Sequence, residues 1–531
     1  MDKSRRNFIR KAGIGLVGAG LGMGVPGVSR AIQGSFNPNF SFNPGDLGPK
    51  PWDDVVNFCP PGKRVLEIVL YGGVSPWETF WVSKGGNDTF TNHDSGMSVN
   101  VNMRGAGDLV RNFDWCDEME DNDHVKFFAK DDSNQDVYWG PATQPLWDDA
   151  IMESARMITF GHDKNVHELA MPLALTGLPL GNPRAAGLGA AISKVYRESP
   201  LCTNQARPYS YVLMPDDIEF YRNIVSSILS TGTHGGANRP VELTVGATGL
   251  GELFLEAEPD AQVRQAMEML RNQYHKRLRW QGNEGHQVRS PQFEDYRSSA
   301  LTLENSSALH ELLGGDTLVA SEGQSCEAVP VTTTRNRTAR SLEVAAMLLD
   351  PNQGNARYVG VFDAGFPSYK YVGAPYDTHP AAGYEGKHIH FTMGNLYNCL
   401  SSLRQLIDQG AIDLSDTMVV LTTEMGRTPS LIGAAEGRNH WTSATVQVLL
   451  GCEGPRGIVG AIDPMTSVAH APAENSTDPF KAAHARAAIL KAAGVNPVMH
   501  DTFSLGDLEG PIYADDDPAM SDLIGERILG V

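Results

Sequence analysis

The residues best suited to chemistry in this sequence are acidic and histidine side chains that follow apolar runs. Glu424 follows the run MVVLTT, and Asp377 and His379 lie in the segment YDTH. His440 closes a glycine-rich stretch that begins after a turn at Arg427. Asp, Glu and His are the usual ligands of hard and borderline divalent metals. A metal held by these side chains would polarise an ester oxygen or activate a water molecule.

Each of these residues also has a purely structural interpretation. Asp-x-His arises often by chance, and Glu424 can form an ion pair with Arg427 inside a turn. His440 can equally be a buried histidine whose ring nitrogens are hydrogen-bonded. A functional interpretation therefore requires that the fold bring several of these side chains together.

Two adjacent glycines form a candidate anion-binding turn. Gly72 and Gly73 follow the apolar run RVLEIVLY, and Ser75 lies two residues further on. Glycine lets the backbone approach a bound anion closely, so that backbone N–H groups can donate to it. We predict that this turn contacts the anionic group of a substrate.

The order of apolar and amphipathic segments predicts the fold class. Patterns typical of strands cover 64–71, 157–160, 211–214, 357–362, 417–422 and 444–450, and helical patterns cover 147–156, 185–197, 216–230, 261–279, 296–313, 341–349, 385–409 and 482–493. Alternation of this kind favours an α/β fold with a mostly parallel central sheet and helices on both faces. Ligands bind such sheets beyond the carboxyl ends of the strands, where the candidate residues lie. His93 and His162 are assigned to loops.

Four regions are predicted along the chain. A signal peptide covers residues 1–31, and an arm rich in Pro, Gly and Asn covers 32–62. An α/β domain covers 63–510, and a tail covers 511–531. Within the domain, 84–145 and 178–340 are predicted to be insertions or a cap. Residues 84–145 are polar with little periodicity, so we expect loops there.

The N-terminus has the pattern of an export signal. A basic segment with the paired Arg5 and Arg6 precedes a glycine-rich apolar run and small residues that end at Ala31. Paired arginines are typical of twin-arginine export, so we predict the twin-arginine machinery as a partner and a periplasmic or extracellular mature protein. No transmembrane segment is expected after cleavage. The alternative is a retained membrane anchor, for which an apolar run of about 17 residues is short.

Composition and charge bound the partners. The 531 residues carry a formal net charge of −20, and a leader ending at Ala31 would remove six basic residues and one acidic residue, which gives −25. Such an anionic body does not favour nucleic acid or an anionic membrane surface. Six scattered cysteines without a C-x-x-C pair permit up to three disulfides outside the cytoplasm. Cys399, on an apolar helix face, is expected to be a core residue.

A series of segments occurs here in one order: RRNFIRKAG, VLYGGVSPWET, NVHELAMPLALTG, YDTH, VVLTTEMGRTP and GRNHW. In that order they resemble an exported, largely uncharacterised bacterial family within the alkaline phosphatase and sulfatase superfamily. Its motifs include R-G-G-x-D-G-L, W-D-T-H, S-E-F-G-R-T-P and D-H-G. The resemblance implies an alkaline-phosphatase-like fold with a large inserted region. It also implies metal-dependent hydrolysis of a small anionic ester.

The resemblance implies a metal site as well. Asp377, His379 and His440 stand where superfamily members keep the ligands of one metal ion. Glu424 occupies the position of an aspartate that binds a second metal. The implied cofactor is a divalent ion such as Zn, Mn, Mg or Ca.

Departures from the family pattern bear on the rest of the site. Met425 replaces a histidine and Ser75 an aspartate, so we expect one metal, or a weak second site helped by Glu78. His167 stands at the position of the superfamily's nucleophile. It is predicted to be a metal ligand, a general base or a nucleophile, and otherwise a helix-start histidine that only forms hydrogen bonds. Arg427 is predicted to clamp an oxyanion, or else to hold its own turn through a salt bridge.

Two functions are therefore under comparison. The first is an exported metal-dependent hydrolase of a phosphate or sulfate ester. The second is a non-catalytic exported binding or scaffold protein on a decayed fold of the same kind, which the missing Ser, Thr or Cys nucleophile favours. Convergence of Asp377, His379 and His440 would favour the enzyme, and side chains that point apart would favour the scaffold.

Overall fold

The computed structural model describes a defined part of the chain. These are residues 62–82, 125–178, 187–198, 211–214, 240–243, 337–363, 365, 375–378, 388–429, 438–470, 479–495 and 523–530, with five helical residues between 265 and 273. The chain divides into two compact units, residues 1–50 with 262–288, and residues 51–261 with 289–531. Apart from the five helical residues, every described element belongs to the second unit.

Several predictions about the ends of the chain concern residues that the structure does not describe. The predicted signal peptide with Arg5 and Arg6, and the predicted arm apart from residue 62, lie outside the described residues, as does most of the predicted tail. Among the helices that the structure describes, none is long and apolar enough to cross a membrane.

A central sheet organises the second unit. Within the described residues it has eight strands in the order β12-β4-β11-β8-β1-β7-β5-β6. Their bounds are β1 Arg64–Val69, β4 Arg156–Phe160, β5 Tyr211–Met214, β6 Val241–Glu242, β7 Tyr358–Phe362, β8 Thr417–Thr422, β11 Thr445–Leu450 and β12 Gly457–Val459. The ladders are parallel except where β11 pairs with β4 and β8. The predicted α/β class with a mostly parallel sheet is confirmed.

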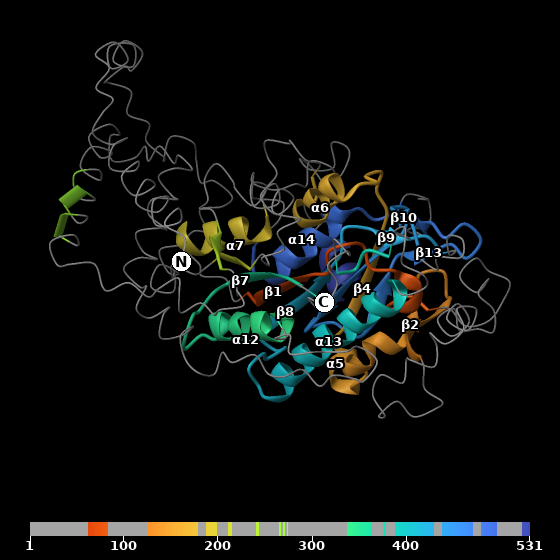
Figure 1. Cartoon of the computed structure of the whole chain (residues 1–531), viewed down its shortest axis with the longest axis horizontal. Coiled ribbons are helices and arrows are strands. Elements are labelled where there is room, and N and C mark those ends of the chain that lie inside the picture. Colours follow the sequence, from red (N-terminus) through yellow and green to blue (C-terminus); the bar gives the residue numbers. More distant parts are fainter. Residues whose placement is uncertain are drawn as a thin grey trace, which may run out of the picture. The chain divides into compact units, whose positions relative to one another are not determined.

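Helices cover both faces of this sheet (Figure 1). One face carries α5 Asp149–Glu153, α12 Arg337–Leu349 and α13 His388–Asp408, and the other carries α6 His167–Thr176, α7 Leu188–Glu198 and α14 Ala482–Ala492. Successive residues of a strand point to opposite faces. Leu66 and Ile68 therefore join the core under α12 and α13, while Val65 and Val69 join the core under α6, α7 and α14. This two-sided burial explains why the strands read as continuous apolar runs.

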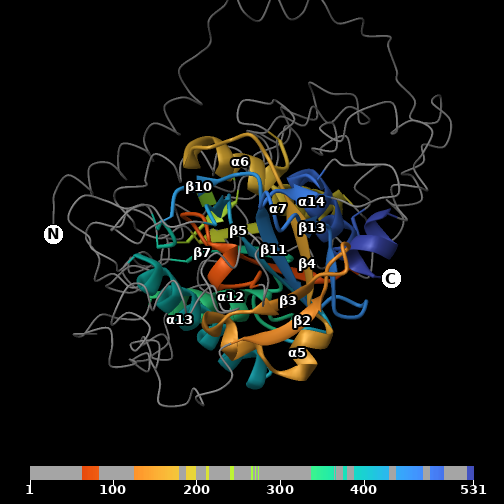
Figure 2. The same ribbon diagram turned by 90° about the vertical axis from the view of Figure 1, so that its right-hand side faces the viewer.

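The expectation of loops over 84–145 is wrong for its described C-terminal part. Strands β2 Lys126–Lys130 and β3 Asp136–Trp139 form a hairpin, and a 3-10 helix, η5, covers Pro141–Leu146. Figure 2 shows the hairpin beside α5. Phe128 and Trp139 stack with ring centroids 4.6 Å apart and are fully buried. Charged residues between Phe128 and Trp139 interrupt the alternation of apolar and polar side chains by which a strand is recognised in the sequence.

Other predicted elements differ mainly in their bounds. The helix expected at 147–156 is only α5, because Asp148 caps its start by accepting from the N–H groups of Ala150 and Ile151, and Arg156 already begins β4. The strand expected at 417–422 is β8, and the helix expected at 385–409 is α13. The helices expected at 216–230 and 296–313 lie outside the described residues.

Two cysteines are described, and both are free thiols. Cys399 and Cys452 are buried, so the prediction that Cys399 belongs to the core is confirmed. Three disulfides therefore do not form, and the other four cysteines lie outside the described residues.

The start of α14 depends on a neutral histidine. His484 Nδ1 accepts a hydrogen bond of 2.9 Å from the backbone N–H of Lys481, the residue that precedes the helix. Glu or Gln normally fills this role at the third helical position. Burial lowers the pKa of His484 to about 4.

We expect the His484→Gln variant to reduce the pH dependence of stability. The folded-state pKa lies below the ordinary value of 6.5. The unfolded chain therefore takes up the proton first, and stability that is present above pH 6.5 is lost as the pH falls toward 4. The loss is worth about 2–3 kcal/mol, whereas glutamine keeps the hydrogen bond and does not titrate. Urea denaturation at pH 7 and pH 4 measures the difference, and equal losses in both proteins would contradict this role.

Candidate functional site

Parallel strands that end at one edge of the sheet position the candidate side chains. The Gly72 turn follows β1, Glu424 follows β8, and the loop after β4 leads to α6. The alignment continues past the strand ends, because Leu70 N–H donates to Thr422 O at 2.8 Å and Tyr376 N–H donates to Tyr71 O at 3.1 Å. The second of these bonds places the segment that carries Asp377 at the same edge.

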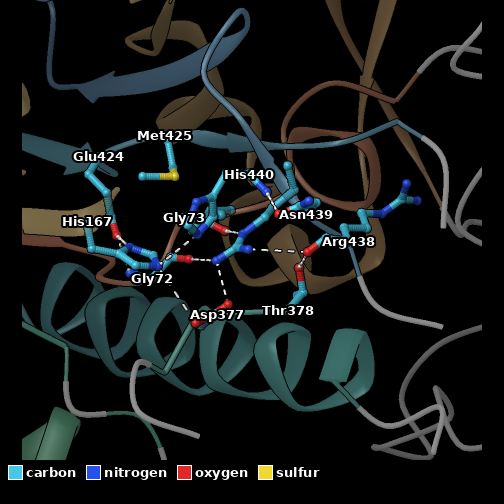
Figure 3. A network of polar contacts seen from close by, with 12 residues as sticks. Gly72, Gly73, His167, Asp377, Thr378, Glu424, Met425, Arg438, Asn439 and His440 are labelled. Atoms are coloured by element: carbon cyan, nitrogen blue, oxygen red, sulfur yellow. Dashed lines mark hydrogen bonds and ion pairs between the residues drawn. The ribbon is translucent and has the colours of Figure 1, made fainter. Parts of the chain in front are cut away.

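His167 and Glu424 form the buried part of the site (Figure 3). His167 Nδ1 lies 2.7 Å from Glu424 Oε1, which also accepts the Gly72 N–H at 2.8 Å. The Glu424 side chain is fully buried, whereas 14% of the His167 side chain is exposed. Glu424 therefore fixes the His167 ring so that the other ring nitrogen, Nε2, is presented to His440 and Asp377.

His440 meets that second nitrogen. Its Nε2 lies 3.1 Å from His167 Nε2, and its Nδ1 lies 2.6 Å from the carbonyl oxygen of Asn165. A carbonyl oxygen only accepts, so His440 Nδ1 carries a proton. His167 Nδ1 carries a proton in the same way toward Glu424. Both Nδ1 atoms are thus occupied by oxygen acceptors, and the two Nε2 atoms face each other.

Asp377 completes the described group. Its Oδ2 lies 3.7 Å from His167 Nε2, and its Oδ1 lies 2.7 Å from Arg427 Nη2. Four of the candidate residues, His167, Asp377, Glu424 and His440, therefore converge on one place. A further candidate ligand, His379, lies outside the described residues.

The carboxylates also set the charge of His167. Burial alone lowers the pKa of His167, but the hydrogen bonds to Asp377 and Glu424, together with their charges, outweigh burial and raise the pKa to about 9. A protonated ring donates from both nitrogens. The two carboxylates therefore favour a positive charge at His167, and a metal ion bound by Nε2 would have to displace its proton.

The donor set suits a transition metal. Histidine ligands almost always donate their other N–H to a carboxylate or a carbonyl, as His167 and His440 both do. Two nitrogens bound tetrahedrally to one zinc ion are about 3.3 Å apart, close to the 3.1 Å found here. Among the described residues no three His, Cys, Asp or Glu side chains already have the arrangement of a complete metal site. Binding would require Asp377 to move closer or His379 to contribute.

The predicted anion-binding turn binds a carboxylate of the chain itself. The Gly72 N–H donates to Glu424, and the carbonyl oxygens of Gly72 and Gly73 accept from Arg427. Ser75 is buried, and its hydroxyl donates to Glu78. This geometry does not fit the expectation that the turn contacts a substrate anion.

Two further candidate side chains are engaged in contacts within the protein. Arg427 is fully buried and pairs with Asp377 instead of Glu424, so it does not fit the role of an oxyanion clamp. Glu78 is also fully buried and pairs with Arg438 through a hydrogen bond of 2.5 Å. The Glu78 carboxylate is thus already engaged by Arg438 and Ser75, and a second metal site stays a prediction. Each side chain already forms an ion pair within the protein, Arg427 with Asp377 and Glu78 with Arg438.

Sequence reasoning missed two parts of the site. His162, assigned to a loop, accepts from Lys164 N–H at 3.1 Å and donates through Nε2 to the Glu424 carbonyl at 2.7 Å. Its place directly after β4 was a usable signal, because side chains at strand ends line this edge. The Asn165 carbonyl left no such signal, since a backbone contact depends only on how the loop folds.

We expect Gly73→Ala to disturb the site. Gly73 has a φ of +84°, and an added Cβ would lie 3.0 Å from Arg427 Nε and 3.1 Å from Met425 Cγ. We expect a loss of about 1–3 kcal/mol in the free energy of unfolding, measured by urea denaturation. Gly410→Ala is the control, because Gly410 has a similar φ of +70° and nothing within 4 Å of an added Cβ. Equal losses in both variants would show that crowding at Gly73 has no effect.

Comparison with known proteins gives one match. Residues 255–504 match a family described as a protein of unknown function, DUF1501. The matched range holds Asp377, His379, Glu424 and His440, but not His167. Neither a curated protein nor a solved structure matches the chain. The match agrees with the expected likeness to a largely uncharacterised family, and over just under half of its length the chain is similar to DUF1501 proteins.

Proposed function

We propose that this protein is an exported, metal-dependent hydrolase of a phosphate or sulfate ester. One observation carries the proposal. Two histidines present their Nε2 atoms to each other at 3.1 Å beside a carboxylate, and both rings are held from behind by oxygen acceptors. The same orientation also serves a hydrogen bond from protonated His167 to His440 Nε2. What supports the proposal is that both Nδ1 atoms are held by oxygen acceptors, as they are in histidine metal ligands.

Each residue has a definite part in the proposed site. His167, His440 and Asp377 would hold the ion, and His379, two residues after Asp377 in the sequence, would add a further ligand. Two imidazole nitrogens with a carboxylate favour zinc or manganese over magnesium or calcium. A bound ion would supply Lewis acidity toward the ester oxygen and would lower the pKa of a bound water. Glu424 orients His167 and is not itself a ligand, which differs from the role implied by the family resemblance.

We take water as the attacking group. In the proposed site both His167 nitrogens are engaged, because Nδ1 lies 2.7 Å from Glu424 and Nε2 would hold the metal, so no lone pair is left for nucleophilic attack. The water oxygen bonds to phosphorus or sulfur, and the alcohol leaves as the ester bond breaks. One proton of the water ends on the departing oxygen, so the step requires no external oxidant or reductant.

The proposal is tested by metal content and turnover together. The full chain, purified without chelator, is expected to contain close to one equivalent of zinc or manganese by mass spectrometry. Wild type is expected to hydrolyse an aryl phosphate or an aryl sulfate, and Asp377→Ala is expected to be at least ~100-fold slower. A folded wild type that takes up no metal would support the binding or scaffold alternative. Equal rates in wild type and Asp377→Ala would show that the catalytic site lies elsewhere.

A further inference from the structure

Arg427 makes an unusual set of contacts for a fully buried cation. Its Nε donates to Gly73 O at 3.0 Å, its Nη1 to Arg438 O at 3.2 Å, and its Nη2 to both Gly72 O and Asp377 Oδ1, the latter at 2.7 Å. The carbonyl of Arg427 accepts from Trp77 Nε1 at 2.6 Å. All three guanidinium nitrogens are thus used by the protein.

These contacts reach the segments of Asp377 and His440 directly and His167 through the Gly72 turn. The Gly72–Gly73 turn holds Glu424, which holds His167. Asp377 is contacted directly. The third segment is tied twice, because the Arg438 carbonyl accepts from Nη1, and because His440 pairs with Arg427 between the short strands β9 Gly426–Arg427 and β10 His440–Trp441.

We propose that Arg427 is the positioning residue that sets the spacing of His167, Asp377 and His440. The inference rests on the proposed function, because it takes these three residues as metal ligands. It gives Arg427 no contact with substrate. A planar guanidinium suits this part because its fixed fork directs donors toward several acceptors at once. Lysine keeps the charge but places its donors on a single nitrogen and loses that geometry.

A second buried arginine offers a matched control. Arg156 donates to the carbonyl oxygens of Ile528, Pro455 and Arg527 at 2.6, 2.7 and 2.6 Å. It begins β4, whereas the site lies beyond the other end of that strand. Arg156→Lys removes the same kind of contacts and leaves the ligand segments untouched.

The test compares zinc affinity, stability and Co²⁺ absorption in full-length, chelator-stripped protein. Arg427→Lys is expected to bind zinc ~10–100-fold more weakly by calorimetric titration, and its Co²⁺ visible spectrum is expected to change. Arg156→Lys is expected to lose comparable thermal stability while its zinc affinity stays within about twofold of wild type. If Arg427→Lys does not fold, Gly73→Ala takes its place, because the added Cβ crowds Arg427 Nε at 3.0 Å, with Gly410→Ala as its control.

The possible failures are distinguishable. If wild type binds zinc and Arg427→Lys, or its substitute, binds it as tightly with an unchanged Co²⁺ spectrum, Arg427 does not position the ligands while the metal site stands. If Arg156→Lys weakens zinc binding as much as Arg427→Lys, the effect reflects general destabilisation, and the inference is overturned. A folded wild type that binds neither zinc nor cobalt overturns both the proposed function and this inference.

Discussion

Replacing His167 with alanine is expected to weaken zinc binding more than ~100-fold and to abolish hydrolysis, because it removes a nitrogen ligand. Glu424→Gln is expected to weaken zinc binding only ~10–100-fold, the range found for groups that orient a ligand from outside. The amide oxygen of glutamine can still accept from the His167 ring and from Gly72. Calorimetric titration of the metal-stripped proteins measures both constants.

The order of these two effects separates the structure from the family resemblance. The resemblance places Glu424 on a metal and leaves the role of His167 open. The structure buries Glu424 behind the His167 ring, with its Oε1 already accepting two hydrogen bonds. If Glu424→Gln weakens zinc binding as much as His167→Ala does, Glu424 is itself a metal ligand. His484→Gln serves as a control, because it replaces a histidine in α14 that contacts the start of that helix and is not a proposed ligand.

The second large effect is expected at a buried ion pair in the centre of the sheet. Glu67 of β1 lies 2.6 Å from Arg486 of α14 and accepts from the hydroxyls of Tyr358 at 2.5 Å and Thr422 at 2.7 Å. Glu67 is fully buried, and Arg486 nearly so. Removing a charge from such a pair leaves the partner ionised with neither water nor a counter-ion to stabilise it.

We expect Glu67→Gln to lower the free energy of unfolding by about 3–5 kcal/mol. Glutamine matches glutamate in size, so the loss reports the uncompensated charge of Arg486 and not a cavity. Urea denaturation followed by tryptophan fluorescence measures it. Adding Arg486→Met to Glu67→Gln is expected to recover part of the loss, because the unpaired charge is then gone. A double variant whose loss equals the sum of the two single losses would show that the charges do not interact.

Neither prediction depends on a contact between residues close in sequence. Gly72 and Glu424 are 352 positions apart, and His167 and Glu424 are 257 apart. Zinc titration on Glu67→Gln, under conditions in which the variant is folded, separates the two effects, because the contacts described for Glu67 are with Tyr358, Thr422 and Arg486 and not with a proposed ligand. We expect its zinc affinity to stay near that of wild type.

The sequence by itself determined the class of the fold and the edge at which the site lies. Burial on both faces requires continuous apolar runs, which marked β1, β7 and β8 and hence the ends that carry Gly72 and Glu424. The three-to-four spacing of apolar residues marked α13 in the same way. These signals are local, because strand and helix periods repeat within a few residues.

Only the tertiary structure decided which atoms of the site meet. Acids, histidines, an arginine and a glycine turn were visible in the sequence, but their partners were not. The Gly72 N–H, which had been expected to bind a substrate anion, donates to Glu424 instead. The guanidinium of Arg427 forms its ion pair with Asp377. The antiparallel direction of β11 and the hairpin of β2 and β3 also escaped the pattern. Hydrogen-bond partners are chosen by which loops end side by side in space, and no local period encodes that choice.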